Sequence, residues 1–197
     1  MGLEEVYARP LVVRGKGKFG GLMMKSAVLA VAMALLAGAA GAQSAPLKLG
    51  LAGLAFLIGD WASGRGRVAQ TGGTSTGSSS IEPVAGGAAL LRRDHTNLFD
   101  ASGKSAGGFD QVMMIYPQGD TLRADYVDGG HVIHYTSAVV VAGKSVTFAS
   151  EARPGVPAFR LSYTLATPAT LAVSFSMAPP GTTEFHPIAT GTLTKAG

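Results

Sequence analysis

Short strand-like segments, separated by turn residues at regular intervals, fill the chain after residue 60 and limit most strongly what it can fold into. Clusters of Gly, Pro, Asp and Ser separate the segments, and a spacing of roughly 8–14 residues is typical of all-β sandwiches and barrels. No strong helix pattern follows residue 60, which argues against folds that alternate helices with strands. The predicted strands are 61–69, 88–96, 108–116, 120–127, 131–141, 145–151, 158–166, 170–178 and 184–194.

Several of these segments alternate apolar and polar residues with a period of two. In 158–166, for example, Phe159, Leu161 and Tyr163 occupy alternate positions. This is the pattern of an antiparallel strand with one buried face. Sequential antiparallel strands leave no open edge if they close into an up-and-down barrel. Because 79–84 is either a tenth strand or part of a bent second one, we expect nine or ten strands, preceded by a short helix within 47–58.

The N-terminal region has the layout of a secretory signal peptide. Lys25 precedes about 11 apolar residues, and small residues follow, ending at Ala40-Gly41-Ala42. The apolar run is shorter than the ~20 residues of a membrane span, so no stable span is expected after processing. We therefore predict a leader extension or misassigned start at 1–22, a cleavable signal helix at 23–42 and a barrel domain at 43–197. The expected localisation is periplasmic or secreted.

The net charge of +4 is concentrated in this leader. Residues 1–42 hold five basic and two acidic groups, whereas the remaining chain holds 11 basic and 10 acidic groups. A nearly neutral domain lacks the basic surface that binding to nucleic acid requires, so nucleic acid is not an expected partner. The chain has no cysteine, which excludes disulfides, thiolate metal sites and a cysteine nucleophile.

A family resemblance centres on Gly59-Asp60-Trp61, which follows the short helix at the start of the first strand. G-x-W in this position resembles the lipocalin and calycin superfamily. Residues 56–66 look closest to bacterial lipocalin-like domains of unknown function and are similar to the opening of nitrobindin-type haem-binding barrels. Gly86-Gly87 after an acidic second strand fits the same group. The resemblance implies that the Trp61 indole plugs one end of the barrel and packs against Lys195 or Arg160.

The first functional hypothesis is a binding module that holds a small apolar or amphipathic molecule inside the barrel. Tyr126, Tyr163 and His134 would orient that molecule if they point inward. The full set of candidate ligand-binding residues is Tyr126, His134, Phe148, Phe159, Tyr163, Phe175 and Met177.

Two alternatives stay open. The resemblance to nitrobindin implies a possible haem, with His186 just before the last strand as the iron ligand, although Pro187 departs from the family's spacing. Small barrels can also be packed solid, which would give a structural or interaction barrel without a ligand.

The remaining motifs do not indicate an enzyme or a metal site. Gly103–Gly107 matches G-x-S-x-G, but it lies between two strands without the following helix that a nucleophile elbow needs. His131 and His134 would point to opposite faces of a strand and cannot chelate one metal. Asp125 and Asp128 are interpreted as turn chemistry. Residues 71–80 are expected to form a loop, either a lid over the cavity or a segment without a role.

Overall fold

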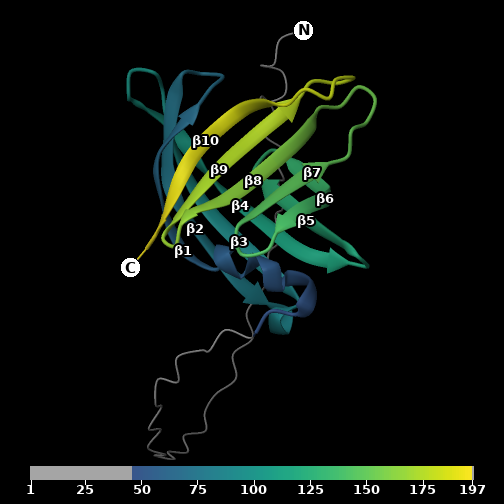
Figure 1. Cartoon of the computed structure of the whole chain (residues 1–197). Helices are drawn as coiled ribbons and strands as arrows, with labels where there is room; N and C mark the ends of the chain where they lie inside the picture. Colours follow the sequence, from purple (N-terminus) through teal and green to yellow (C-terminus); the bar gives the residue numbers. More distant parts are fainter. Residues whose placement is uncertain (1–45, 197) are drawn as a thin grey trace, which may run out of the picture. The chain divides into compact units, whose positions relative to one another are not determined.

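The computed structural model describes residues 46–196, which form a closed antiparallel barrel of ten strands (Figure 1). This confirms the predicted all-β barrel with a short N-terminal helix, here the 3₁₀ helix η2 (Leu49–Leu57). The strands are β1 (Gly59–Val68), β2 (Gly73–Val84), β3 (Ala89–Phe99), β4 (Ser105–Gln118), β5 (Thr121–Asp128), β6 (Val132–Val141), β7 (Ser145–Ser150), β8 (Ala158–Thr167), β9 (Thr170–Ala178) and β10 (His186–Lys195), with a 3₁₀ turn η3 (Ala85–Gly87) between β2 and β3.

The predicted leader at 1–22 and the signal peptide at 23–42 lie outside the described residues, so both stay predictions. Among residues 46–196, no helix is long and apolar enough to cross a membrane.

Each strand pairs with its neighbours in the chain, and β1 pairs with β10 to close the ring. The closing register places Trp61 opposite Lys195 and Ser63 opposite Leu193. Up-and-down connectivity follows from the short turns, because two- to seven-residue links join antiparallel neighbours more readily than distant strands. Every described strand pairs with two neighbours around the ring, which removes most of the unpaired edge that is the usual template for aggregation.

The prediction of a loop at 71–80 is wrong, because Gly73–Ser80 form the first two-thirds of β2. This half of β2 is rich in Gly and Ser, and such residues are rare in strands. It pairs on both sides, with β1 and with β3. A Cβ on Gly73 or Gly77 would collide with the carbonyl oxygen of Phe99 or His95 on β3. The small residues therefore allow β2 and β3 to approach closely, and tertiary pairing overrides the local propensity.

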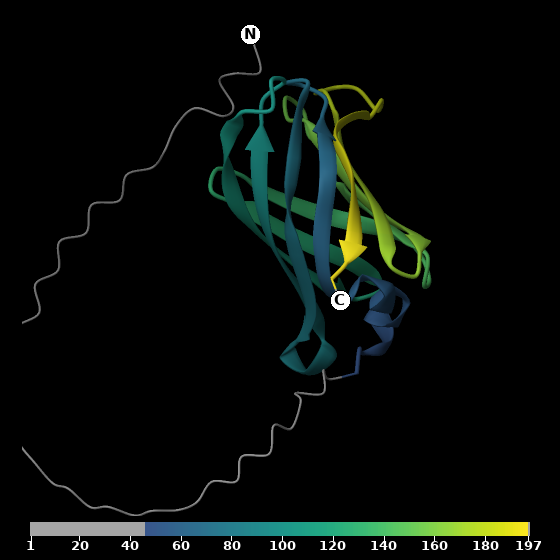
Figure 2. The ribbon, with the colours of Figure 1, turned by 90° about the vertical axis from the view of Figure 1, so that its left-hand side faces the viewer.

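Helix η2 covers one end of the barrel, which we call the base (Figure 2). Its Leu51, Leu54 and Leu57 are fully buried in the core, and the Gly53 carbonyl accepts a hydrogen bond from Gly143 N. The leucines recur every third residue, which matches the three residues per turn of a 3₁₀ helix and places them on one face.

Trp61 fills the base beside η2. Its indole Nε1 donates to the Leu57 carbonyl at 2.8 Å, and the ammonium of Lys195 lies 5.5 Å from the ring centroid. Of the two expected partners, Lys195 therefore contacts the indole. Arg160 instead lies on the outside of β8, with its guanidinium 3.8 Å from the Phe185 ring centroid.

Candidate functional site

Burial of the interior changes along the barrel axis. Near the base, most inward side chains of β3, β4, β7, β8 and β9 are buried, with Leu165 on β8 partly buried. The opposite end, which we call the mouth, is formed by the links 69–72, 100–104, 129–131, 151–157 and 179–185. Most inward side chains nearer the mouth are only partly buried, although Ile133 on β6 is buried. The partly buried ones are Asp94, Thr96, Leu98, Phe109, Gln111, Tyr126, Asp128, Phe159, Phe175 and Met177. The barrel is thus filled at its base and accessible to solvent toward its mouth.

Aromatic side chains form the apolar part of this interior. The rings of Phe159 and Phe175 stack with centroids 5.6 Å apart and planes at 10°. Deeper in the barrel, Tyr135 and Phe148 pack with centroids 6.0 Å apart. Stacked and tilted aromatic pairs are rigid apolar surfaces that suit contact with hydrocarbon.

A charged pair lies between the filled base and the mouth. Arg92 on β3 is 8% exposed, and its Nε donates to Asp94 Oδ2 at 2.7 Å while Nη2 also contacts this oxygen. Nη2 donates to Gln111 Oε1 at 3.2 Å, and the guanidinium lies 5.8 Å from the Tyr163 ring centroid. A buried charge needs partners of this kind, because removal from water is costly. We call Ser79, Arg92, Asp94, Gln111 and Tyr163 the polar layer.

The ionisation of the polar layer follows from its surroundings. Burial alone would lower the pKa of Arg92, but the Asp94 carboxylate that accepts its hydrogen bonds favours the charged form and the pKa is raised, so the guanidinium stays charged. Burial raises the pKa of the Tyr163 phenol well above its ordinary value, which keeps the hydroxyl protonated and available as a donor.

Sequence reasoning did not identify Arg92 and Asp94 as interior residues. The available signal was the alternation with Leu90, which places 90, 92 and 94 on one face, while Arg93 points outward and pairs with Glu82. A hydrophobicity pattern cannot distinguish a buried ion pair from surface charges, because both residues count as polar wherever they lie.

A second hydrogen-bond network lies closer to the mouth. Asp128 Oδ1 accepts from the backbone N–H groups of Gly130 and His131 at 2.8 and 2.7 Å, and Oδ2 accepts from the Tyr126 hydroxyl at 2.8 Å. The His131 ring also contacts Oδ1 at 3.1 Å. The turn interpretation of Asp128 describes its backbone contacts but not its link to the inward Tyr126.

These bonds give Asp128 a measurable pH signature. Burial would raise the pKa of Asp128, but the donors from Gly130, Tyr126 and His131 outweigh burial and lower it from the ordinary 3.8. A lowered pKa in the folded state adds stability above pH ~4, which is lost as the pH falls through the folded value. We expect Asp128→Asn to lower the free energy of unfolding at pH 7 by about 1–2 kcal/mol, the usual contribution of hydrogen bonds to a charged group.

Urea unfolding at pH 7 and at pH 3, followed by Trp61 fluorescence, tests this contribution of Asp128 to stability. The difference in the free energy of unfolding between Asp128→Asn and the wild type should be smaller at pH 3 than at pH 7. The control is Asp120→Asn, which changes an exposed carboxylate in the β4–β5 turn. An Asp128→Asn difference that is the same at both pH values would contradict the assignment.

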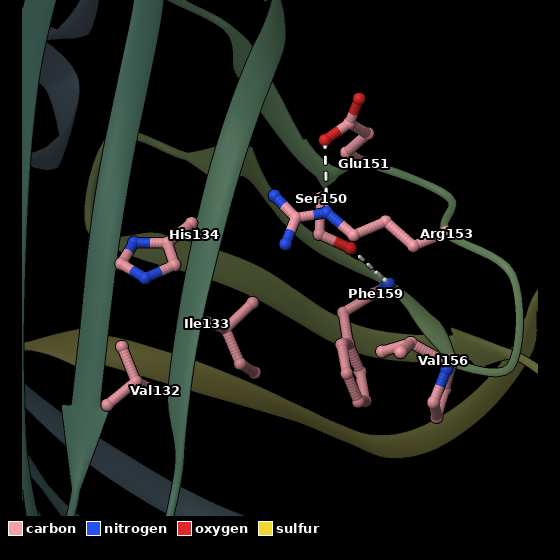
Figure 3. Close-up of a pocket in the computed structure, with 9 residues that line it drawn as sticks. Val132, Ile133, His134, Ser150, Glu151, Arg153, Val156 and Phe159 are labelled. Carbon is pink, nitrogen blue, oxygen red and sulfur yellow. Dashed lines mark hydrogen bonds and ion pairs between the residues drawn. The ribbon is translucent and has the colours of Figure 1, made fainter.

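A pocket of about 120 Å³ opens beside the interior where β6 and β7 separate (Figure 3). Pairing between these strands starts only at Tyr135 and Ser150, so 132–134 lie next to the 151–157 link without a partner on β7. The pocket is lined by Val132, Ile133, His134, Ser150, Glu151, Arg153, Val156, Pro157 and Phe159. Ile133 and Phe159 also face the interior, so the pocket lies against the same apolar wall.

The structure brings six of the seven predicted ligand-binding residues to the interior face. Phe148 and Tyr163 are buried; Tyr126, Phe159, Phe175 and Met177 are partly buried.

His134 lies on the outer face instead, because Ile133 and Tyr135 on either side of it point inward and successive strand residues alternate. Its side chain is 65% exposed and contacts Asp125 at 2.6 Å. Figure 3 shows it leaving β6 on the side opposite Ile133. It cannot orient a molecule inside the barrel.

His186 is the first residue of β10 and lies at the rim of the mouth. Its ring is 62% exposed, and Nε2 is 3.8 Å from Glu184 Oε1. A haem ligand needs a large apolar pocket around the ring, whereas the ring of His186 is mostly exposed and its neighbour Glu184 is a carboxylate. The surroundings of His186 therefore do not fit a haem. Among residues 46–196, no group of three or more His, Asp or Glu side chains is arranged to hold a metal ion.

No protein-family model matches the chain, and no curated protein matches it in sequence. Among solved structures, the chain is similar to EF1p2_mFAP2b, which was solved bound to DFHBI. The identity is 13% and the TM-score 0.39, over 76% of this chain and 100% of that chain.

Proposed function

We propose that this protein is a lipocalin-like binding barrel that takes a small amphipathic molecule into the mouth half of its interior. The observation that carries the proposal is the change in burial along the axis, from a filled base to partly exposed aromatic and polar side chains. A barrel packed solid from end to end would bury its inward aromatics throughout. Here Phe159, Phe175 and Met177 keep accessible surface that a ligand would cover.

Two kinds of surface in this half favour an amphipathic ligand over a purely apolar one. The stacked Phe159 and Phe175 offer an apolar wall, and burial of hydrocarbon there would contribute about 25 cal/mol per Å² before the costs of binding. Arg92, Asp94 and Gln111 of the polar layer lie on β3 and β4, the Tyr126–Asp128 pair lies on β5, and these side chains supply hydrogen-bonding groups. A few fixed polar groups in an apolar cavity are typical of small-molecule sites.

Binding is tested with the full chain and N-phenyl-1-naphthylamine, an uncharged dye whose emission rises in apolar surroundings. We expect saturable binding and displacement by ten-carbon amphiphiles. Met177→Glu places a charge near the mouth and Phe175→Glu places one deeper; each should weaken dye binding about tenfold or more, equal to about 1.4 kcal/mol. Both side chains are partly exposed, so the fold should tolerate the change.

The matched control is Val139→Glu, because Val139 is apolar but 72% exposed on the outer face of β6. It should bind the dye like the wild type. Absence of saturable binding would reject the proposal. The proposal would also be rejected if Val139→Glu lost dye affinity while Met177→Glu and Phe175→Glu kept it, since that result would place the dye on the outer surface.

A further inference from the structure

The pocket where β6 and β7 separate combines hydrocarbon walls with one cationic side chain at its rim (Figure 3). Ile133 is buried, Phe159 is partly buried, and Val156 on the 151–157 link is 50% exposed. The pocket has a volume of about 120 Å³, and an apolar cavity of about 150 Å³ holds one benzene ring. It therefore has room for an apolar group about the size of a single aromatic ring.

The lengths of neighbouring strands produce this pocket. β7 ends at Ser150, whereas β6 already pairs with β5 from Val132 and β8 pairs with β9 from Ala158. The 151–157 link forms a short bridge of its own and does not continue the pairing of β7 with β6. The wall of the barrel is therefore open sideways where β7 stops, and side chains from β6, β8 and the link surround the opening.

The cationic side chain is Arg153, which one ion pair holds at the rim. Its Nε donates to Glu151 Oε2 at 3.1 Å. Figure 3 shows the guanidinium reaching from the link toward β6, with Glu151 on the side opposite Ile133 and Phe159. Within residues 46–196 only Nε of this guanidinium is bonded, so Nη1 and Nη2 can donate two parallel hydrogen bonds, the geometry in which arginine binds a carboxylate.

The other polar side chains of the pocket do not favour a cation. Glu151 is the carboxylate among the lining residues, and the guanidinium already engages it. Ser150 Oγ accepts from Phe159 N at 2.8 Å, so its own O–H can donate to a ligand. His134 is turned to the outer face, where it contacts Asp125. Donors beside hydrocarbon complement an anion that is attached to a compact apolar group.

We propose that this side pocket binds a small aromatic monocarboxylate, with its ring between Ile133, Val156 and Phe159. The carboxylate would bind Nη1 and Nη2 of Arg153 at the exposed rim, where it keeps contact with water and avoids the cost of full burial. Glu151 is a positioning residue that fixes the guanidinium above the pocket. The inference goes beyond the proposed binding in the mouth half and does not depend on it.

Four small molecules separate the contributions of charge and ring: benzoate, benzamide, benzylammonium and acetate. Each is titrated at pH 7.5 into the nitrogen-15-labelled full chain, and amide shifts in NMR spectra give both affinity and location. We expect saturable shifts around 132–134 and 150–159, with benzoate binding about tenfold tighter or more than the other three, which lack either the negative charge or the ring. A benzoate affinity no higher than that of any other probe would overturn the inference, as would no saturable shift in these segments.

Two variants locate the carboxylate and the ring. Arg153→Gln should weaken benzoate about tenfold or more and leave benzamide unchanged, since it removes only the charge-assisted bonds. Val156→Asp places a negative charge in the wall and should also weaken benzoate. Both side chains are at least half exposed, so the fold should tolerate the changes.

The matched control is Arg160→Gln, because Arg160 is also an exposed arginine beside an apolar side chain, the Phe185 ring, but does not line the pocket. It should bind benzoate like the wild type. If Arg153→Gln keeps the wild-type affinity for benzoate, the guanidinium does not hold the carboxylate and the inference is wrong. The dye titration reports on the interior separately, so either proposal can fail while the other stands.

Discussion

Replacing Arg92 with leucine is expected to destabilise the folded barrel by about 3–5 kcal/mol, the usual cost of removing one partner from a buried ion pair. The guanidinium is the group that neutralises Asp94 inside the barrel, through Nε at 2.7 Å and through Nη2. Without it, the carboxylate is left buried with a negative charge and no cation. Urea unfolding followed by fluorescence measures the loss, because Trp61 is the single tryptophan of the chain.

Two further variants separate this charge effect from lost packing. Arg92→Leu combined with Asp94→Leu removes both charges and should recover most of the stability, since apolar replacement of a whole buried pair is often neutral or stabilising. Arg93→Leu removes the neighbouring arginine, whose exposed ion pair with Glu82 should contribute less than about 1 kcal/mol. If the double variant is as unstable as Arg92→Leu alone, the unpaired Asp94 charge is not the cause of the lost stability.

A single methyl group on Gly77 is expected to destabilise the barrel by about 3 kcal/mol, the upper end of the usual cost of overpacking. The added Cβ of Gly77→Ala would collide with the His95 carbonyl oxygen and lie 3.0 Å from its carbon and 3.2 Å from Thr96 Cα. These are backbone atoms of the paired strand β3, so they cannot move aside without breaking the ladder between β2 and β3.

The matched substitution is Gly129→Ala in the β5–β6 turn, where an added Cβ has no atom within 4 Å and the backbone φ is not positive. Its stability should stay within about 0.5 kcal/mol of the wild type, as for most surface changes. Thermal unfolding by circular dichroism compares the two. Similar melting temperatures for Gly77→Ala and Gly129→Ala would mean that β2 and β3 are further apart than described here.

Most strands could be predicted from the sequence because their core face leaves a period-two pattern. Leu171, Val173 and Phe175 mark β9, and Phe159, Leu161 and Tyr163 mark β8. Turn residues fix the boundaries, since Asp128–Gly130 and Ala142–Gly143 interrupt the pattern at the ends of strands. Six of the seven candidate residues face the interior of the barrel, and their role in binding a ligand stays a prediction.

Two of the failures have the same physical cause, because strand pairing and side-chain direction overrode what the residue composition suggested. Gly73–Ser80 looks like a loop because Gly and Ser have low strand propensity, yet two partners hold it in the sheet. The polar layer was missed because an inward Arg92–Asp94 pair looks like surface. His134 was placed inside although the alternation of its own strand, with Ile133 and Tyr135 buried, puts it outside.

The choice of Lys195 over Arg160 as the partner of Trp61 was also beyond the sequence, because it depends on the register between the first strand and the last. Closure pairs β1 with β10, the first strand with the last, and puts Lys195 opposite Trp61. Local sequence carries no information about a contact between residues so far apart in the chain.

That closing contact also has a consequence for how the chain is made. During synthesis β1 pairs with β2 early, but its other edge must wait for His186–Lys195, the last strand to leave the ribosome. Until then the growing sheet has two open edges, one of them at β1. The barrel is therefore completed only after β10 has left the ribosome. A chain that stops before β10 would expose both edges permanently and is expected to be the form most prone to aggregate.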